Sequence, residues 1–237
     1  MLNGLTIAFD LDGTLVETAP DLIAAANHVL TSDGFDPVEA HLIRDQISFG
    51  ARAMISRGLE INKAVRTAEQ VDELLARFLR HYEANIAVHS HAFPNVVDVL
   101  EACRARGARL VVCTNKSTYL SEQLLAALDI RGYFEGIAGR DTFDVCKPHP
   151  DHLLGAISMV GGDPLRALMV GDSDTDISTA RAAGIPSVAV TFGYTDVPAV
   201  QLGATEVIEH YQDFDRALER IVARMPASVS PSSRKCE

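Results

Sequence analysis

Short runs of β-branched and apolar residues recur along the chain, and helical patterns lie between them. Each run is short and apolar enough for a strand that is buried on both faces of a sheet. Strands that alternate with helices are typical of a parallel sheet with helices on both faces. The alternation therefore predicts an α/β fold with a Rossmann-like core. The runs are LTIAFD (5–10), RLVVCT (109–114), ALMVGD (167–172) and SVAVTF (187–192).

Helical spacing fills most of the remaining chain, but one long stretch departs from the alternation. Core helices are predicted at 94–106, 119–128, 150–160 and 175–183. Residues 18–87 carry helical spacing throughout, with a helix also predicted over PVEAHLIRDQI (37–47), and no convincing strand. We therefore predict an α/β core from residues 1–17 and 88–225, with a helical cap domain at 18–87 inserted after the first strand. The Pro- and Ser-rich residues 226–237 predict a mobile tail.

The charge of the chain limits its partners. The 237 residues carry a formal charge of −11, and lysine and arginine form no basic block. Nucleic acids and anionic membranes bind clustered Lys and Arg, so neither is expected as a partner. An anionic substrate must then meet a local positive site, for which a metal ion is the obvious candidate. The four cysteines lack close paired spacing, and neither a signal sequence nor a transmembrane run is present, which predicts a reduced, cytoplasmic protein.

Polar side chains follow the predicted strands at the edge where ligands bind in open α/β sheets. Because the carboxyl ends of parallel strands meet at one edge, we expect these side chains to share one crevice. A Pro-rich loop before a predicted helix adds a lysine to the set. The residues are Asp10 and Asp12, Thr114 and Asn115, Asp172 and Asp176, and Lys147.

This set of side chains predicts a particular chemistry. Carboxylates gathered in one crevice repel each other unless a cation shares them. Oxygen ligands favour Mg²⁺, which binds through one or two carboxylates together with a substrate phosphate. A metal, a lysine and a threonine hydroxyl around one anion make a phosphoryl-transfer site, in which one carboxylate could attack phosphorus.

Four motifs, in this order, resemble those of the haloacid dehalogenase superfamily of phosphotransferases, over the chain to about residue 225. In DLDGT, the resemblance makes Asp10 the nucleophile and Asp12 the acid/base. In VVCTNK, it places Thr114 and the Asn115 backbone on the phosphate. In KPHP, it makes Lys147 the cation that neutralises nucleophile and phosphate.

The fourth motif, GDSDTD, would complete the metal site. By resemblance, Asp172 binds Mg²⁺ directly together with Asp10 and the backbone carbonyl of Asp12, and Asp176 supports the ion from one shell further out. Resembling dehalogenases lack an acid two residues after the nucleophile, so Asp12 disfavours carbon–halogen cleavage. The sequence thus predicts a Mg²⁺-dependent phosphomonoesterase that works through an aspartyl phosphate.

Phosphoglycolate phosphatases and their close relatives are resembled most by four stretches: DGTLVETAPDLIAAAN, FPNVVDVL, TNK and KPHPDHLLGAI. This resemblance implies 2-phosphoglycolate as the substrate. In the cap stretch SFGARAM, a basic residue, Arg52, follows the glycine and alanine, which departs from some phosphoglycolate enzymes and would suit a larger sugar phosphate. We predict that Arg52 contacts the substrate, and a surface position on a cap helix stays open as the alternative. A sugar-phosphate phosphatase, such as one acting on an amino-sugar acid 6-phosphate, and a hexose phosphomutase stay open as alternatives. The intact set of motif residues disfavours a non-catalytic binding module.

Two other metals fit the sequence less well than magnesium. A calcium loop beginning at Asp172 would need glycine and glutamate where Ile177 and Ala183 stand. Zinc at Cys146, His149 and His152 would lack a second ligand pair. The expected partner is a small phosphate monoester, with no nucleic acid and no membrane, and the protein is expected as a monomer or homodimer.

Overall fold

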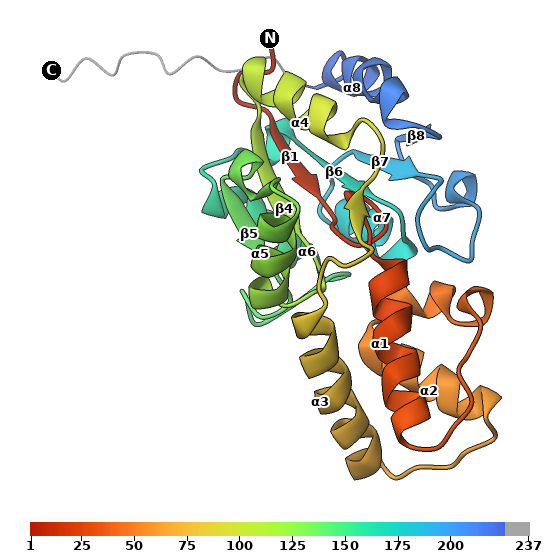
Figure 1. Ribbon diagram of the computed structural model, residues 1–237. Helices are drawn as coiled ribbons and strands as arrows, with labels where there is room; N and C mark the ends of the chain where they lie inside the picture. Colours follow the sequence, from red (N-terminus) through yellow and green to blue (C-terminus); the bar gives the residue numbers. More distant parts are fainter. Residues whose placement is uncertain (226–237) are drawn as a thin grey trace, which may run out of the picture.

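The computed structural model describes residues 1–225, so the tail predicted at 226–237 lies outside the described residues. A parallel sheet in the order β5-β4-β1-β6-β7-β8 confirms the predicted α/β fold (Figure 1). The four predicted strands are present, and β5 and β8, each of three residues, are additions that the sequence reasoning missed. The strands are β1 (Thr6–Phe9), β4 (Arg109–Cys113), β5 (Gly136–Ala138), β6 (Ala167–Gly171), β7 (Ser187–Val190) and β8 (Glu206–Ile208).

Helices cover both faces of this sheet because successive strand residues point to opposite sides. On β1, Ile7 and Phe9 pack into the hydrophobic cluster of one face, whereas Ala8 packs into that of the other. The first face is covered by α4 (Val96–Ala105), α5 (Thr118–Ala127) and α8 (Phe214–Val222), and the second by α6 (Pro150–Met159) and α7 (Asp174–Ala182). Since β1 lies between β4 and β6, its carboxyl end falls where ligands bind in such sheets.

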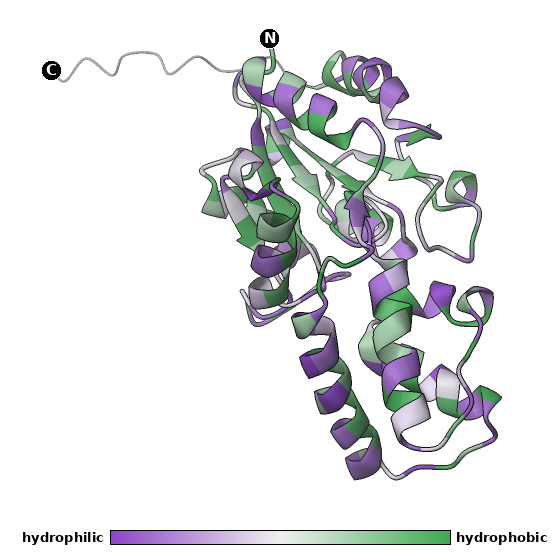
Figure 2. Ribbon diagram, viewed as in Figure 1, coloured by the Kyte–Doolittle hydropathy of each residue, from purple (hydrophilic) through white to green (hydrophobic). Residues whose placement is uncertain are grey.

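Three helices between β2 and β3, here called the cap helices, pack around a hydrophobic cluster of their own. They are α1 (Ala19–Ser32), α2 (Ala51–Ile61) and α3 (Ala68–Ala84). Figure 2 shows that α3 is hydrophobic on the side facing α1 and hydrophilic on its outer side. The helix expected over 37–47 is instead two short 3₁₀ segments, η1 (Ala40–Leu42) and η2 (Arg44–Phe49). Its buried residues, Ile43 and Ile47, meet the cluster, while Arg44 turns away to Glu17.

A small antiparallel ribbon, here called the hinge ribbon, joins the two connections between the sheet and the cap helices. It pairs β2 (Val16–Glu17) with β3 (His91–Ala92), strands too short to be predicted from the sequence. Asp21 on α1 ties the connections further, because its carboxylate accepts hydrogen bonds from the Ser90 amide at 2.8 Å and hydroxyl at 2.7 Å. The division into domains at residues 17/18 and 87/88 stays a prediction.

Short 3₁₀ segments complete the described chain: η3 (Arg131–Tyr133), η4 (Pro164–Arg166), η5 (Ala199–Gln201) and η6 (Tyr211–Asp213). Within residues 1–225, no helix has the length and apolar character needed to cross a membrane.

Candidate active site

Three buried carboxylates meet at the carboxyl ends of β1 and β6. Asp10 follows β1, Asp172 follows β6, and Asp176 lies in the first turn of α7; one oxygen of each lies within 4.8 Å of the others. Burial raises the pKa of Asp10 to about 6, and the charge of Asp176 adds to the rise. Burial, with the charges of Asp176 and Asp10, also raises the pKa of Asp172 well above its usual range. The cluster is therefore electrostatically unfavourable by itself and would be relieved by a cation.

Lys147 supplies one such charge. Its Nζ lies 2.8 Å from Oδ1 of Asp10 and 2.5 Å from Oδ1 of Asp176, and its side chain is buried. Burial by itself would lower the pKa of Lys147, but the charges of Asp10 and Asp176 raise it well above its usual range. Lys147 is thus a permanently charged group beside the predicted nucleophile.

Asp12 makes a separate ion pair. The Nζ of Lys116 donates to both Asp12 oxygens, at 3.0 and 3.1 Å, and lies 4.5 Å from the ring centroid of Tyr82 on α3. The family motifs predict a free Asp12 side chain and no role for Lys116, the last residue of VVCTNK. The structure brings the predicted acid/base, a lysine of the second motif and a residue of a cap helix into one group.

The charges around the crevice fit a divalent cation. Four carboxylates stand against two ammonium groups, which leaves a formal excess of two negative charges. The donors are all oxygen atoms, which suits Mg²⁺ or Ca²⁺ better than a transition metal. The acidic residues are Asp10, Asp12, Asp172 and Asp176, and the lysines are Lys116 and Lys147.

The second motif lies against the same crevice. Oγ1 of Thr114 accepts a hydrogen bond from the Lys116 amide at 3.2 Å. Nδ2 of Asn115 donates to the Lys147 carbonyl at 2.9 Å, while its Oδ1 is buried without a hydrogen-bond partner among the described residues. Asn115 thus connects the end of β4 to the loop that carries Lys147.

Three further residues hold the acids in place, and the sequence reasoning missed them. Thr14 Oγ1 donates to Oδ1 of Asp172 at 2.9 Å, and the amide of Tyr194 donates to Oδ2 of Asp172 at 2.7 Å. Ser173 donates to Oδ2 of Asp176 from its amide at 3.1 Å and its hydroxyl at 2.6 Å. Because Tyr194 follows β7, the rule that placed the other residues at strand ends could also have pointed to its loop.

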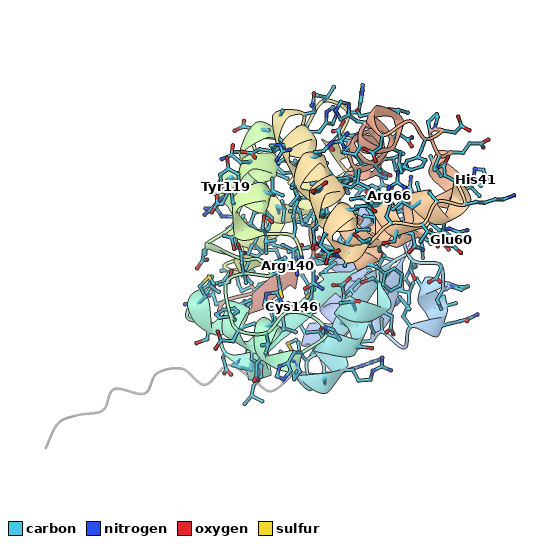
Figure 3. All side chains as sticks on the ribbon, turned by 90° about the horizontal axis from the view of Figure 1, so that it is seen from below. His41, Glu60, Arg66, Tyr119, Arg140 and Cys146 are labelled. Carbon is cyan, nitrogen blue, oxygen red and sulfur yellow. The ribbon has the colours of Figure 1, made fainter. Side chains whose placement is uncertain are left out.

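The crevice opens into a cavity of about 500 Å³ between the sheet and the cap helices. The motif residues line one side, with Tyr119 and Arg140 beside them; Figure 3 shows these two and Cys146 on the same side of α3. The opposite side is mostly apolar. Its residues include Leu22, Ile47, Phe49, Met54, Phe78 and Tyr82. One side of the cavity therefore carries the charges, and the other can exclude water.

Arg52 lies elsewhere in this structure. It forms an ion pair with Asp72 of α3, its side chain is half exposed, and among residues 1–225 it does not belong to the cavity lining, although its neighbours Gly50 and Ala51 do. A contact between Arg52 and the substrate stays a prediction.

These features define a class of hydrolases: a parallel α/β core, an acidic crevice at the ends of β1 and β6, and a helical insertion beside the crevice. The chain belongs to the haloacid dehalogenase-like hydrolase family, whose sequence model matches residues 7–190.

Similar proteins of named activity narrow the assignment within this family. A phosphoglycolate phosphatase of Caulobacter vibrioides is 46% identical over 95% of both chains. One of Agrobacterium fabrum is 41% identical over 93% of this chain and 95% of its own. The crystal structure of a predicted phosphoglycolate phosphatase from Haemophilus somnus matches with a TM-score of 0.85 at 30% identity, over 92% of this chain and 99% of that one. The chain is thus an enzyme of the phosphoric monoester hydrolase class.

Proposed function

We propose that this enzyme hydrolyses 2-phosphoglycolate to glycolate and phosphate, with Mg²⁺ and through an aspartyl phosphate on Asp10. The observation that carries the mechanism is the buried contact of Asp10 with Lys147 beside Asp172 and Asp176. The substrate is supported by the relatives, two of which are named phosphoglycolate phosphatases at 46% and 41% identity.

In the first step, an oxygen of Asp10 would attack phosphorus while the bond from phosphorus to the glycolate oxygen breaks. Lys147 would neutralise charge on the nucleophile and the phosphoryl oxygens, and Thr114 would donate its hydroxyl proton to one of them. Asp12 would give its proton to the leaving glycolate oxygen. Asp10, Asp172 and the Asp12 carbonyl would hold Mg²⁺, with Asp176 behind them, and the ion would supply positive charge for the carboxylates and the phosphate.

In the second step, a water molecule would attack the aspartyl phosphate and give its proton to Asp12. The phosphorus–oxygen bond to Asp10 breaks, inorganic phosphate leaves, and Asp10 is restored as a carboxylate. Since Asp12 is paired as a carboxylate with Lys116 in this structure, it would have to leave that lysine and take up a proton from solvent before it protonates the glycolate oxygen.

Two cationic side chains near the crevice would suit the carboxylate of phosphoglycolate. Lys116 lines the cavity, and its release from Asp12 would leave it available for an anion. Arg140 also lines the cavity and makes no ion pair with the residues that the structure describes, although the charge of Asp141 is nearby. We propose that Arg140 receives the substrate carboxylate. A charge-assisted hydrogen bond of this kind contributes roughly 1.5–3 kcal/mol.

A second candidate function has one observation in its favour. A cavity of about 500 Å³ is larger than glycolate needs, so a sugar-phosphate phosphatase acting on a larger substrate would fit the same site. A hexose phosphomutase would use the same crevice, but it would release little free phosphate.

The partners and setting of the enzyme are also part of the proposal. We infer a small phosphate monoester as substrate, a monomer or homodimer, and a cap at residues 18–87 that closes over the site. A reducing, cytoplasmic setting is supported by the cysteines of residues 1–225, Cys103, Cys113 and Cys146, which are free thiols.

A phosphate-release assay tests the proposal. The panel would contain 2-phosphoglycolate, an amino-sugar acid 6-phosphate, glucose 1-phosphate and p-nitrophenyl phosphate. The highest kcat/KM is expected for 2-phosphoglycolate. Chelation should abolish turnover and Mg²⁺ should restore it, whereas Ca²⁺ should restore it poorly because it favours longer bonds and more ligands. Full activity after exhaustive chelation would refute the metal requirement. A kcat/KM ten times higher for a sugar phosphate than for 2-phosphoglycolate would refute the proposed substrate.

A further inference from the structure

The loop after β7, TFGYTD (residues 191–196), reaches both the acidic cluster and the beginning of the cap helices. The amide of Tyr194 in this loop donates to Oδ2 of Asp172 at 2.7 Å. The Tyr194 side chain is 2% exposed and packs into the hydrophobic cluster of the cap helices, whose residues are far from it in sequence. One residue of the sheet side is therefore built into the packing of the cap.

The hydroxyl of Tyr194 closes the first turn of α1. Thr18 precedes this helix, and its own side chain makes no capping bond. The Tyr194 hydroxyl accepts from the Thr18 amide at 2.6 Å and the Ala19 amide at 3.0 Å, and it donates to Oε1 of Glu17 at 2.9 Å. Burial raises the pKa of this hydroxyl well above its usual range, so it keeps the proton that it donates. It thereby satisfies two amides at the start of the helix, those of Thr18 and Ala19, which have no partner within the helix.

A second element of the cap also rests on this residue. The guanidinium carbon of Arg44, in η2, lies 4.9 Å from the centroid of the Tyr194 ring. Nη2 of the same arginine lies 2.7 Å from Oε2 of Glu17 in the hinge ribbon. Ring, guanidinium and carboxylate thus form one group at the point where the chain leaves the sheet.

The ring has no room to shift toward the catalytic loop. Gly13 of DLDGT has φ +82°, and a Cβ there would lie 2.9 Å from Cδ2 of Tyr194 and 2.6 Å from Oδ2 of Asp172. A Cβ at Gly193 would lie 2.3 Å from the same Asp172 oxygen. Close packing of this kind transmits a displacement instead of absorbing it.

We propose that Tyr194 is a positioning residue that couples the acidic cluster to the hinge of the cap. Its amide is hydrogen-bonded to the Asp172 carboxylate and moves with it. Its hydroxyl holds residues 17–19, where α1 begins. A ligand that orders Asp172 would thereby order the first turn of α1 and set the direction in which the cap closes. The proposal rests on the proposed function, because it assigns the closing motion to that reaction.

The test compares Tyr194→Phe with Tyr211→Phe. Both changes remove one buried hydroxyl, but that of Tyr211 donates to the carbonyl of Thr14 at 3.0 Å and not to the hinge. Amide hydrogen exchange would be measured with and without Mg²⁺ alone. In the unmodified enzyme and in Tyr211→Phe, Mg²⁺ should slow exchange of the amides in residues 18–22, which are those of Thr18, Ala19, Asp21 and Leu22. In Tyr194→Phe, this slowing should be lost, while slowing of the amides near Asp10 persists.

Kinetics give a second measurement. Tyr194→Phe should lower kcat for the best substrate of the panel by about tenfold, as misplacement of closing groups does. The loss should be smaller for p-nitrophenyl phosphate, and Tyr211→Phe should leave the ratio of the two kcat values unchanged. Arg44→Ala, which leaves Tyr194 in place, should shift the ratio in the same direction and is a substitute if Tyr194→Phe does not fold.

The two proposals fail in different ways. If the unmodified enzyme released phosphate from no compound of the panel, the proposed function would be wrong, and the exchange experiment would still decide the role of Tyr194. If Tyr194→Phe kept the Mg²⁺-dependent slowing at residues 18–22, or changed both kcat values by the same factor, the coupling would be refuted and Tyr194 would be a packing residue only.

Discussion

The two sides of the cavity are built by different rules. On the sheet side, Asp10 and Asp172 follow β1 and β6 and the polar Thr114 follows β4, and each is held by at least one ion pair or hydrogen bond at 2.7–3.2 Å. On the cap side, apolar residues such as Ile47, Met54 and Phe78 come from separate helices and turns. The sheet side thus holds groups that would react, and the cap side decides what is excluded from them.

The comparison shows why a reaction class is easier to infer than a substrate. A strand end has a fixed place in a parallel sheet, so the residue that follows it has a fixed place in the site. A residue on an inserted helix reaches the cavity only if the helix has the right rotation, and that depends on packing between the cap helices.

The largest effect is expected at the nucleophile on the sheet side. Asp10→Asn should abolish turnover, because an amide cannot form the acyl phosphate. Asp12→Asn should still form the acyl phosphate on Asp10 and should lose chiefly proton transfer, which lowers kcat by roughly 10²- to 10⁴-fold. Steady-state phosphate release measures both, with circular dichroism to show that each variant is folded.

The same two variants can refute the assignment. Near-normal phosphate release by Asp10→Asn would remove Asp10 from the nucleophilic role. A larger loss in Asp12→Asn than in Asp10→Asn would exchange the two roles and would weaken the view that the sheet side follows the family motifs.

The sequence predicted more of the sheet side of the cavity than of the cap side. The α/β fold, four of the strands and the meeting of Asp10, Thr114 and Asp172 followed from apolar runs and strand ends, and Lys147 was added from its Pro-rich loop. Strands β5 and β8 and the hinge ribbon were missed, because two or three residues carry no periodicity.

Long-range contacts were beyond the sequence for a different reason. The pairing of Asp12 with Lys116 joins residues 104 positions apart, and the hydrogen bond from the Thr18 amide to the Tyr194 hydroxyl spans 176 positions. Neither is encoded in a local pattern. The segment 37–47 was predicted as a helix from spacing alone, but its ion pair to Glu17 and its short turns belong to the tertiary structure.

A smaller effect is expected on substrate preference than on the reaction itself. It can be tested with one arginine from each side of the cavity. Arg140→Ala should lower kcat/KM for 2-phosphoglycolate by about tenfold to a hundredfold, which is the loss of one charge-assisted hydrogen bond, and should change p-nitrophenyl phosphate turnover much less. Arg140→Lys should recover part of the loss. An equal loss on both substrates would place Arg140 outside carboxylate recognition.

Arg52 is the matching residue of the cap helices. The sequence predicts that Arg52→Ala impairs the native substrate more than p-nitrophenyl phosphate. Because Arg52 is paired with Asp72, Asp72→Ala is a useful companion: it frees the arginine without removing it. If Arg52 reaches the substrate on closure, Asp72→Ala should leave kcat/KM equal or higher while Arg52→Ala lowers it. No change in either variant would make the pair a surface feature of the cap.

The smallest effect is expected at the end of α3 remote from the site, where the cap can be weakened without touching a catalytic group. Thr67 caps this helix by accepting from the Gln70 amide at 3.3 Å, and Gln70 accepts from the Thr67 amide at 3.0 Å. Thr67→Ala should lower the free energy of unfolding by about 1 kcal/mol, and Thr67→Ser should preserve it. Turnover of p-nitrophenyl phosphate should stay unchanged. If residues 18–87 form a domain of their own, amide exchange in the Thr67→Ala variant should quicken in α3 and leave β1 and β4 as they were. An equal increase in the strands of the sheet would show that both sides of the cavity unfold as one unit, and the predicted domain boundaries at 17/18 and 87/88 would then describe topology without independent stability.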